Sequence, residues 1–346
     1  MGPDCGTAYL GGIGLGFANV VKPGRVGCVA ASGTGLQAVA AHLAALGEGI
    51  SHGIGVGGRD LSAEVGGLMT TLALELLATD PATEAIVVIS KPPAPDVLPA
   101  LERAIAQVAK PVVVCCLGAR PAAASPARWV STLADAAGAV AAVLGGHPWT
   151  PSRLDAADSR ARLAGVERRG EKRGPGVLGL YTGGTLAHEA RLLMEPLLGQ
   201  ASTRFDGASV PLRIVDLGDD EFTVGRPHPM LDPEARSARV REAGRDQGIG
   251  VLLLDLVLGR AAHPDPARAL ADAFAEARRT AAAEGRGLVG VASVVGTPDD
   301  PQGLTGQVAT LRSAGIEILP SNADAARFAA LVARPALAPS LLGDGP

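Results

Sequence analysis

The chain has 346 residues, of which 47% are apolar, 3% are aromatic and 19% are charged, and its formal net charge is −4. This length is enough for two domains of ordinary size, each with its own core. The charge balance does not predict nucleic-acid binding, which needs a basic patch. No apolar stretch of about eighteen residues is present, and no basic segment precedes an apolar run at the start, so we expect neither membrane insertion nor secretion. The sequence therefore predicts a cytoplasmic protein.

A strand, a tight turn and a helix are predicted near the start of the chain. The apolar run 26–30 indicates a buried strand, and apolar residues at helical spacing follow from residue 36. Backbone N–H groups and the positive end of the helix dipole meet at such a turn, and glycine lets a phosphate come close. The turn residues are the first predicted phosphate ligands: Ser32, Gly33, Thr34 and Gly35.

The same arrangement recurs in the second half. The apolar run 177–181 is followed by a turn that leads into another helix. In this turn Gly183, Gly184 and Thr185 are the second set of predicted phosphate ligands. Two such turns predict two halves that hold one phosphate between two helix N-termini. The alternative is two separate structural turns, because glycine is common wherever a strand passes into a helix.

Apolar runs and helical periods alternate along the rest of the chain. Further strands are predicted after Gly49 and at 85–89, 111–117, 212–217, 250–258, 288–295 and 316–319. Helices are predicted at 63–78, 95–109, 126–144, 232–245, 266–284, 305–313 and from 322 onward. The glycine-rich start, residues 1–12, is predicted as a loop. This alternation predicts an α/β fold with parallel, doubly wound sheets.

Changes in composition predict the domain boundaries. Residues 1–147 and 176–334 form the two predicted domains, and 148–175 is a charged segment without a clear apolar period. We interpret this segment as a solvated linker, with a functional basic patch as the alternative. The proline- and glycine-rich tail, 335–346, is expected to fray.

The four cysteines do not have the spacing of metal ligands. Cys28, Cys115 and Cys116 lie in predicted buried strands, and Cys5 lies in the glycine-rich start. We expect inert thiols in a reducing compartment.

Two polar residues near the first turn are candidate catalytic groups. Arg59 follows a glycine loop, and its planar fork suits a carboxylate or phosphate. The alternative is a loop-stabilising pair with Asp60. His52 is a candidate general base or carbonyl polariser, and the alternative is a strand-end histidine bonded to backbone.

The densest polar cluster is the segment 219–228. Its carboxylates, Asp219, Asp220 and Glu221, would bind Mg²⁺, hold a substrate amine or shift one another's pKa values. Asp220 and His228 are predicted catalytic residues, and Arg226 a predicted substrate ligand. A solvent-exposed loop or a subunit contact is the alternative. Asp265 lies at the end of a predicted strand, where it is either a ligand-facing residue or a helix N-cap.

Several motifs resemble known families. Segments 2–6, 53–58 and 80–89 are similar to the succinyl-CoA synthetase α subunit, and 182–186 and 250–274 to the C-terminal domain of its β subunit. Nearly the whole chain resembles the FdrA family. The motifs that carry this resemblance are the segments 49–52, 57–62, 90–93, 219–229, 263–266 and 321–322. The resemblance implies two flavodoxin-like domains of the succinyl-CoA synthetase type, without the N-terminal CoA-binding domain.

The FdrA resemblance also implies an activity. Proteins of this family are subunits of oxamate carbamoyltransferase in purine (allantoin) catabolism, which converts carbamoyl phosphate and oxamate to oxalurate and phosphate, or the reverse. The implied partners are other carbamoyltransferase subunits, further copies of the chain and a small phosphate substrate.

One departure bears on the mechanism. The synthetases carry phosphate on a histidine in the loop that corresponds to residues 118–126, and this loop contains no histidine. We therefore expect a phosphate that arrives on a small substrate, without CoA and without any certain cofactor, and we leave Mg²⁺ open. The alternatives are an NDP-forming acyl-CoA ligase-like subunit and a non-catalytic scaffold subunit that binds a phosphate metabolite.

Overall fold

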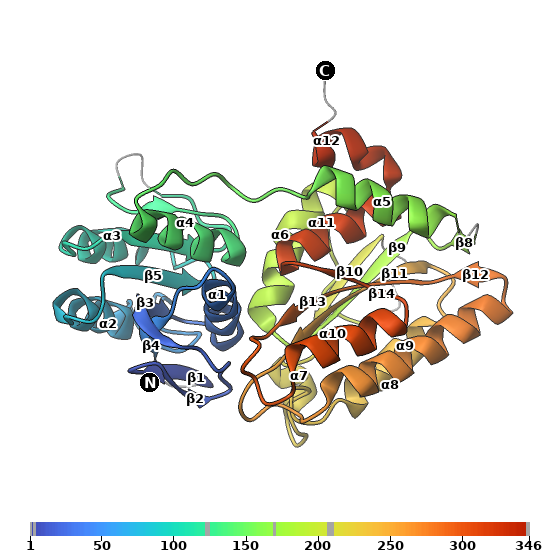
Figure 1. Ribbon diagram of the computed structural model, residues 1–346, viewed down its shortest axis with the longest axis horizontal. Helices are drawn as coiled ribbons and strands as arrows, with labels where there is room; N and C mark the ends of the chain where they lie inside the picture. Colours follow the sequence, from blue (N-terminus) through green and yellow to red (C-terminus); the bar gives the residue numbers. More distant parts are fainter. Residues whose placement is uncertain (1, 3–4, 122–124, 169–170, 206–210, 344–346) are drawn as a thin grey trace. The chain divides into compact units, whose positions relative to one another are not determined.

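The computed structural model describes residues 2, 5–121, 125–168, 171–205 and 211–343 (Figure 1). The chain divides into two compact units. The first contains Met1–Ser152 together with Leu258–Ala261 and Gly296–Pro301, and the second contains Arg153–Val257, Ala262–Val295 and Gln302–Pro346. Two short segments from late in the sequence thus belong to the first unit. The predicted domains were continuous segments of the sequence and did not include this exchange.

The first unit is built on a seven-stranded sheet in the order β2-β1-β4-β3-β5-β6-β7. Its strands are β1 (Thr7–Leu10), β2 (Ile13–Gly16), β3 (Pro23–Ala30), β4 (Ile50–Gly55), β5 (Ala85–Ser90), β6 (Val112–Cys116) and β7 (Arg128–Trp129). Its helices are α1 (Gly33–Ala45), α2 (Leu68–Thr79), α3 (Leu98–Ala106) and α4 (Leu133–Gly145). α1 packs with α4, and α2 packs with α3.

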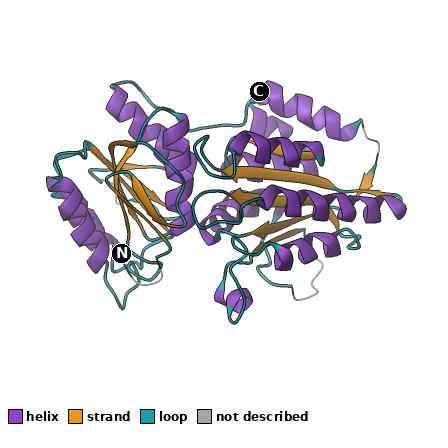
Figure 2. Ribbon diagram, turned by 60° about the horizontal axis from the view of Figure 1, so that its bottom comes forward, coloured by secondary structure: helices purple, strands orange, loops and turns teal. Residues whose placement is uncertain are grey.

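The second unit is built on a five-stranded, fully parallel sheet in the order β10-β9-β11-β13-β14. Its strands are β9 (Gly176–Tyr181), β10 (Leu212–Asp216), β11 (Ile249–Val257), β13 (Val289–Val295) and β14 (Ile316–Leu319), and a separate ribbon pairs β8 (Lys172–Arg173) with β12 (Arg286–Gly287). Its helices are α5 (Ala156–Glu167), α6 (Gly184–Leu198), α7 (Asp220–Thr223), α8 (Glu234–Ala243), α9 (Pro266–Ala283), α10 (Leu304–Ser313), α11 (Asn322–Ala333) and α12 (Ala338–Leu342), with a 3-10 turn η1 (Pro335–Leu337). Figure 2 shows helices on both faces of each sheet.

Both sheets have the strand order of a flavodoxin-like fold. Numbered within its own unit, each parallel set runs 2-1-3-4-5: β4-β3-β5-β6-β7 in the first unit and β10-β9-β11-β13-β14 in the second. The predicted α/β class with two flavodoxin-like domains is therefore confirmed. In this order the chain reverses direction across the sheet beside the first strand, and ligands bind at the carboxyl ends of the strands there.

Continuous apolar runs make the central strands. Every residue of β5, β9 and β11 is buried, as expected for parallel strands covered by helices on both faces. In the first unit, Leu74 and Leu77 of α2 join Ile86 and Val88 of β5 in one buried cluster. This cluster of the first unit therefore consists mainly of aliphatic side chains, which agrees with the low aromatic content.

The glycine-rich start was wrongly predicted as a loop. β1 and β2 form an antiparallel hairpin, and β1 also pairs antiparallel with β4. Gly11 and Gly12 have φ values of 56° and 80°, a backbone region that glycine enters at little cost, and they make the turn. The first sheet is mixed for this reason. The motif 2–6 extends partly outside the described residues.

Two helices begin five or more residues later than predicted. α2 starts at Leu68, after Gly66 and Gly67 with positive φ, and Gly67 is its N-cap residue. α4 starts at Leu133, where Thr132 Oγ1 accepts from the N–H of Asp135. In both places helix-forming residues precede the helix, but their backbone is not helical.

The predicted charged linker and the tail contain regular structure. Asp155 caps α5, and Ser159, Leu163 and Val166 are buried along one side of that helix. The basic run at 168–175 lies partly outside the described residues. After Arg334 the chain forms η1 and α12 instead of fraying. None of the helices in the described part of the chain is long and apolar enough to cross a membrane.

Candidate functional site

The turn before α1 is an open set of backbone donors. Ser32 is the N-cap, and its Oγ accepts from the N–H of Gly35 at 2.9 Å. Within the described residues, no hydrogen bond takes the N–H of Gly33 or Thr34, and both residues are partly exposed. A Cβ at Gly33 would lie 2.9 Å from Thr7 Oγ1, so any other residue there would displace the Thr7 hydroxyl. Of the four predicted ligands, Gly33 and Thr34 present amides for an anion, whereas the Gly35 amide is already used.

The corresponding turn before α6 is already occupied by a carboxylate. Asp255, near the carboxyl end of β11, accepts from the N–H of Thr182 at 2.9 and 3.1 Å and from the N–H of Gly183 at 3.0 Å. It also accepts from Thr182 Oγ1 at 3.1 Å. Gly183 is a predicted phosphate ligand, and in this structure its amide donates to Asp255. Gly184 and Thr185 form the first turn of α6 beyond it.

A buried arginine balances Asp255. Arg236 Nη2 lies 3.0 Å from Asp255 Oδ1, and the two side chains are 6% and 0% exposed. Burial lowers the pKa of Arg236, and the Asp255 charge opposes that shift. Burial, followed by the charge of Asp255, raises the pKa of Tyr181 well above its usual range. Tyr181 is therefore a neutral hydrogen-bond donor, and its hydroxyl donates to Asn322 Oδ1 at 3.1 Å.

His228 joins this edge of the second sheet. Its Nδ1 accepts from the N–H of Met230 at 3.2 Å, so the neutral ring carries its proton on Nε2. Burial lowers its pKa, and Asp255 acts weakly in the opposite direction, so the ring is neutral near pH 7. A Cβ on Gly218 would lie 2.6 Å from His228 Nε2 and 2.9 Å from Thr182 O. The bare glycine thus leaves room for His228 beside the carboxyl ends of β9 and β10.

The other polar residues of that loop lie at the surface. Asp219 caps the single turn α7 by accepting from the N–H of Glu221 at 3.1 Å, and Asp220 and Arg226 are exposed. In the described residues, no three His, Cys, Asp or Glu side chains come together as metal ligands. The loop therefore has the geometry of the solvent-exposed alternative, and its carboxylates do not form a ready-made Mg²⁺ site.

His52 and Asp60 have structural contacts. His52 Nδ1 accepts from the N–H of Gly11 at 3.3 Å, and its Nε2 lies 3.8 Å from Asp80 Oδ2. Asp60 is buried and accepts from Met69 N, Thr70 N and Thr70 Oγ1 at 2.9, 2.9 and 2.6 Å. His52 thus makes the backbone bond of the alternative, and Asp60 holds the start of α2. Arg59 is exposed beside it.

The cysteines in strands are buried. Cys28, Cys115 and Cys116 are at most 2% exposed, and burial raises the pKa of Cys28 and Cys116 to about 12. Such thiols stay protonated and unreactive. The loop 118–126, which carries no histidine, is described only in part.

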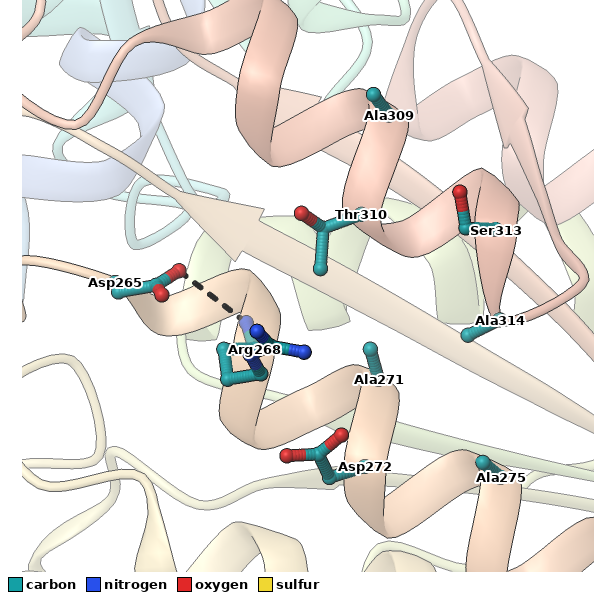
Figure 3. Close-up of a pocket in the computed structure, with 9 residues that line it drawn as sticks. All are labelled: Asp265, Arg268, Ala271, Asp272, Ala275, Ala309, Thr310, Ser313 and Ala314. Carbon is teal, nitrogen blue, oxygen red and sulfur yellow. Dashed lines mark hydrogen bonds between the residues drawn. The ribbon is translucent and has the colours of Figure 1, made fainter.

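A separate groove lies between α9 and α10 (Figure 3). It encloses about 480 Å³, and small residues form most of its wall. Asp265 at one end caps α9 by accepting from the N–H of Arg268 at 3.4 Å and from Gln307 Nε2 at 3.1 Å. The helix-cap interpretation of Asp265 is confirmed.

Sequence reasoning missed Asp255, Arg236 and Asp216. Asp255 is the one charged residue in a nine-residue buried strand, which was a detectable signal because an unpaired buried charge is costly. Asp216 Oδ1 accepts from the N–H of Gly218 at 2.9 Å at the end of β10. Arg236 lies on α8, and nothing in its local sequence distinguishes it from the other arginines there.

Part of the second unit is similar to a known family. Residues 180–332 match the CoA-ligase family. The matched region contains the α6 turn, His228, Arg236 and Asp255. The match agrees better with the acyl-CoA ligase alternative than with carbamoyl transfer.

Individual relatives add little about activity. The chain is 39% identical over 341 residues to the uncharacterized protein YahF of Escherichia coli (strain K12), an alignment that covers 93% of this chain and 64% of YahF. The chain thus spans less than two thirds of that relative's length. Because YahF is itself uncharacterized, the FdrA assignment stays a prediction.

Two solved structures are also similar. A dinucleotide-forming acetyl-coenzyme A synthetase of Ca. Korarchaeum cryptofilum, in complex with phosphate and ADP, shares 16% identity over 99% of this chain and 72% of its own, with a TM-score of 0.33. A protein of Pyrococcus horikoshii OT3 shares 14% identity over 96% of this chain and 69% of its own, also with a TM-score of 0.33. Both TM-scores are low, and a shared arrangement does not follow from them.

Proposed function

We propose that this chain is a CoA-ligase-type subunit that handles the phosphate group of an acyl phosphate. The observation that carries the proposal is the CoA-ligase match of residues 180–332, whose sheet edge presents the first turn of α6 and the neutral ring of His228.

The chemistry needs donors for a departing phosphate. When a thiol attacks an acyl phosphate, it loses its proton to a base, a C–S bond forms, the C–O bond to phosphate breaks, and the phosphate leaves with additional negative charge. Preorganised N–H groups stabilise such charge, and one donor of this kind is worth roughly 3 kcal/mol. Each unit taken by itself offers candidate donors: the amides of Gly33 and Thr34 in the first unit and the Gly184 amide in the second.

Carbamoyl transfer is the second candidate, and one observation favours it. The loop 118–126 contains no histidine to carry a phosphate, so a phosphate that arrives on carbamoyl phosphate suits the chain. An amide nitrogen of oxamate would attack the carbamoyl carbon, form a C–N bond, lose its proton to a base and release phosphate. The same donors would serve this reaction.

Thr34 offers a test that does not depend on partner subunits. It is the second residue of α1, so Thr34→Asp places a negative charge beside the proposed phosphate while it favours the helix dipole. We expect affinity for acetyl phosphate, measured by calorimetry, to fall by about tenfold or more. Thr34→Asn is the matched neutral control and should bind as the unchanged chain does. Equal affinities for the two variants would exclude the α1 turn as the phosphate site.

Phosphate release then separates the two reactions. The chain, mixed with its operon neighbours, is supplied either with acetyl phosphate and CoA or with carbamoyl phosphate and oxamate. Release in the first mixture alone supports the ligase-type function, and release in the second alone supports carbamoyl transfer. Release in neither mixture, with intact binding at α1, would contradict both reactions and leave the scaffold alternative.

A further inference from the structure

We infer that Asp255 is an internal anion that fills the donor set before α6 and excludes an external phosphate from the amides of Thr182 and Gly183. The residues concerned all lie in the second unit. The inference stands on their contacts alone and holds whichever phosphate compound the chain uses.

The donors at this turn are those of an anion site. Two backbone N–H groups, from Thr182 and Gly183, and one hydroxyl, Thr182 Oγ1, converge on the Asp255 carboxylate at 2.9 to 3.1 Å. Amides at the passage from a parallel strand into a helix bind phosphates and carboxylates in many α/β proteins. Here the anion is supplied by the neighbouring strand, β11.

A buried cation completes the set. Arg236 Nη2 lies 3.0 Å from Asp255 Oδ1, and the same nitrogen donates to the Asp255 carbonyl oxygen. An arginine buried to this degree requires an anion, because an uncompensated buried charge strongly destabilises the fold. Removal of the Asp255 carboxylate would therefore leave a cavity with one guanidinium and three donors, all directed at the missing anion.

The two similar turns thus differ in what they offer. Before α1 the capping group is the neutral hydroxyl of Ser32, which accepts from the Gly35 amide. Before α6 a charged side chain uses every donor up to Gly183. A phosphate at Thr182 and Gly183 would compete with Asp255 for the same N–H groups and would bring two like charges together in a buried place. The α6 turn therefore offers an external ligand only the amides that follow Gly183.

Rescue by a small anion tests this inference. Asp255→Ala should lower the melting temperature in sodium chloride, and sodium formate at equal ionic strength should restore much of the loss, because formate replaces the carboxylate beside Arg236. At a formate concentration ten times its Kd, the folded-to-unfolded ratio should rise about tenfold. The unchanged chain should gain nothing specific from formate. A bound formate between Arg236 and Thr182 in the variant's crystal structure would confirm the position.

Asp60→Ala is the matched control. Asp60 is also buried and also accepts from two amides and one hydroxyl, but these donors, Met69 and Thr70, are neutral. It should lose stability without rescue by formate. The double variant Asp255→Ala/Arg236→Met should likewise lose the formate effect. Equal formate responses of Asp255→Ala and Asp60→Ala would overturn the inference.

If the Asp255→Ala variant folds poorly, a refolding experiment still tests the inference. Refolding from urea is then compared in formate and in chloride, and the yield of soluble, helical protein is measured. A higher yield in formate supports the inference. Failure to refold in either salt contradicts it, because the vacant donor set should accept the replacement anion.

Discussion

At the scale of single residues, burial in the fold decides whether a histidine ring is charged. His42 lies in α1, where burial lowers its pKa to about 4. His228 lies beside β9 and β10, where burial also lowers its pKa. Since the ordinary value is about 6.5, both rings are neutral in the folded protein at neutral pH. For His228 this neutrality sets the charge of the sheet edge near Asp255, whereas for His42 it affects stability alone.

His42 should make the protein acid-sensitive. Between its unfolded pKa near 6.5 and its folded value near 4, the unfolded chain binds a proton that the folded chain does not, so stability falls as the pH falls. The free energy of unfolding should fall between pH 7 and pH 4, and His42→Gln should reduce this fall by about 1–2 kcal/mol. Urea unfolding at several pH values measures the difference. The exposed His147 is the control, and His147→Gln should keep the full pH dependence. Identical pH profiles for His42→Gln and the unchanged chain would contradict this expectation.

The helix α2 shows at the scale of one element how position outweighs residue type. Leu74 and Leu77 face the sheet and are 1% exposed, whereas Leu68, Leu72 and Leu76 are 72%, 45% and 54% exposed. The five leucines are chemically equal, and all have high helix propensity. Their contributions to stability should therefore divide by burial alone.

A pair of substitutions on α2 checks this division. Leu74→Ala removes buried methyl groups from the cluster with Val88 and should lower the free energy of unfolding by about 2–5 kcal/mol. Leu72→Ala, half a turn away, should lower it by less than about 1 kcal/mol, because that side chain is already half in solvent. Denaturant unfolding of both variants measures the difference. Similar losses would mean that the outer face of α2 is covered by another surface in solution.

At the scale of the whole molecule, a buried polar network connects segments of the first unit that lie far apart in the sequence. Asn19 Nδ2 donates to Asp300 Oδ2 at 2.7 Å and to Leu258 O at 3.0 Å, and Gln37 Nε2 donates to the same carbonyl at 3.2 Å. Asp300 also accepts from the N–H of Val20 at 2.7 Å. Leu258 and Asp300 follow β11 and β13, so the first unit is incomplete without residues from the second half of the sequence.

Fragments of the chain test this dependence. Residues 153–346 contain the whole second sheet and should unfold cooperatively on their own. Residues 1–152 lack the partners of Asn19 and Gln37 and should be less stable than the same unit in the full chain, since buried amides without partners cost about 1–3 kcal/mol each.

Asn19→Ala provides the internal control for the fragments. It should cost more stability in the full chain than in the fragment 1–152, where Leu258 and Asp300 are missing and the contact with Gln37 remains. Circular dichroism during urea unfolding measures both differences. An equal cost in both contexts would show that the network with Leu258 and Asp300 does not stabilise the first unit.

The central strands were predictable from sequence to within a residue or two. β5, β9 and β11 are continuous apolar runs bounded by glycine, proline or charged residues, and a parallel strand buried on both faces requires such a run. The hairpin of β1 and β2 was not predictable in the same way. It depends on pairing with β4, which lies about forty residues further along the chain, and glycines are poor local indicators of strands.

The site was predicted only in part for the same physical reason. The position of both turns followed from local sequence, because a strand, a small-residue turn and a helix are close along the chain. What each turn can bind depends on which side chains the fold brings to it. Ser32 is a local partner of the first turn, whereas Asp255 reaches the second from more than seventy residues away, with Arg236 from α8 behind it.

Sequence by itself thus determined the α/β class, the two repeated turns and the central strands, since these rest on hydrophobic period and local turn chemistry. Tertiary structure alone decided that α5 fills the predicted linker, that Asp60 and His52 have structural contacts, and that one turn is open while the other holds Asp255. Local interactions set backbone geometry, but the charge and hydrogen-bond partners of a buried group come from neighbours that only the folded chain brings together.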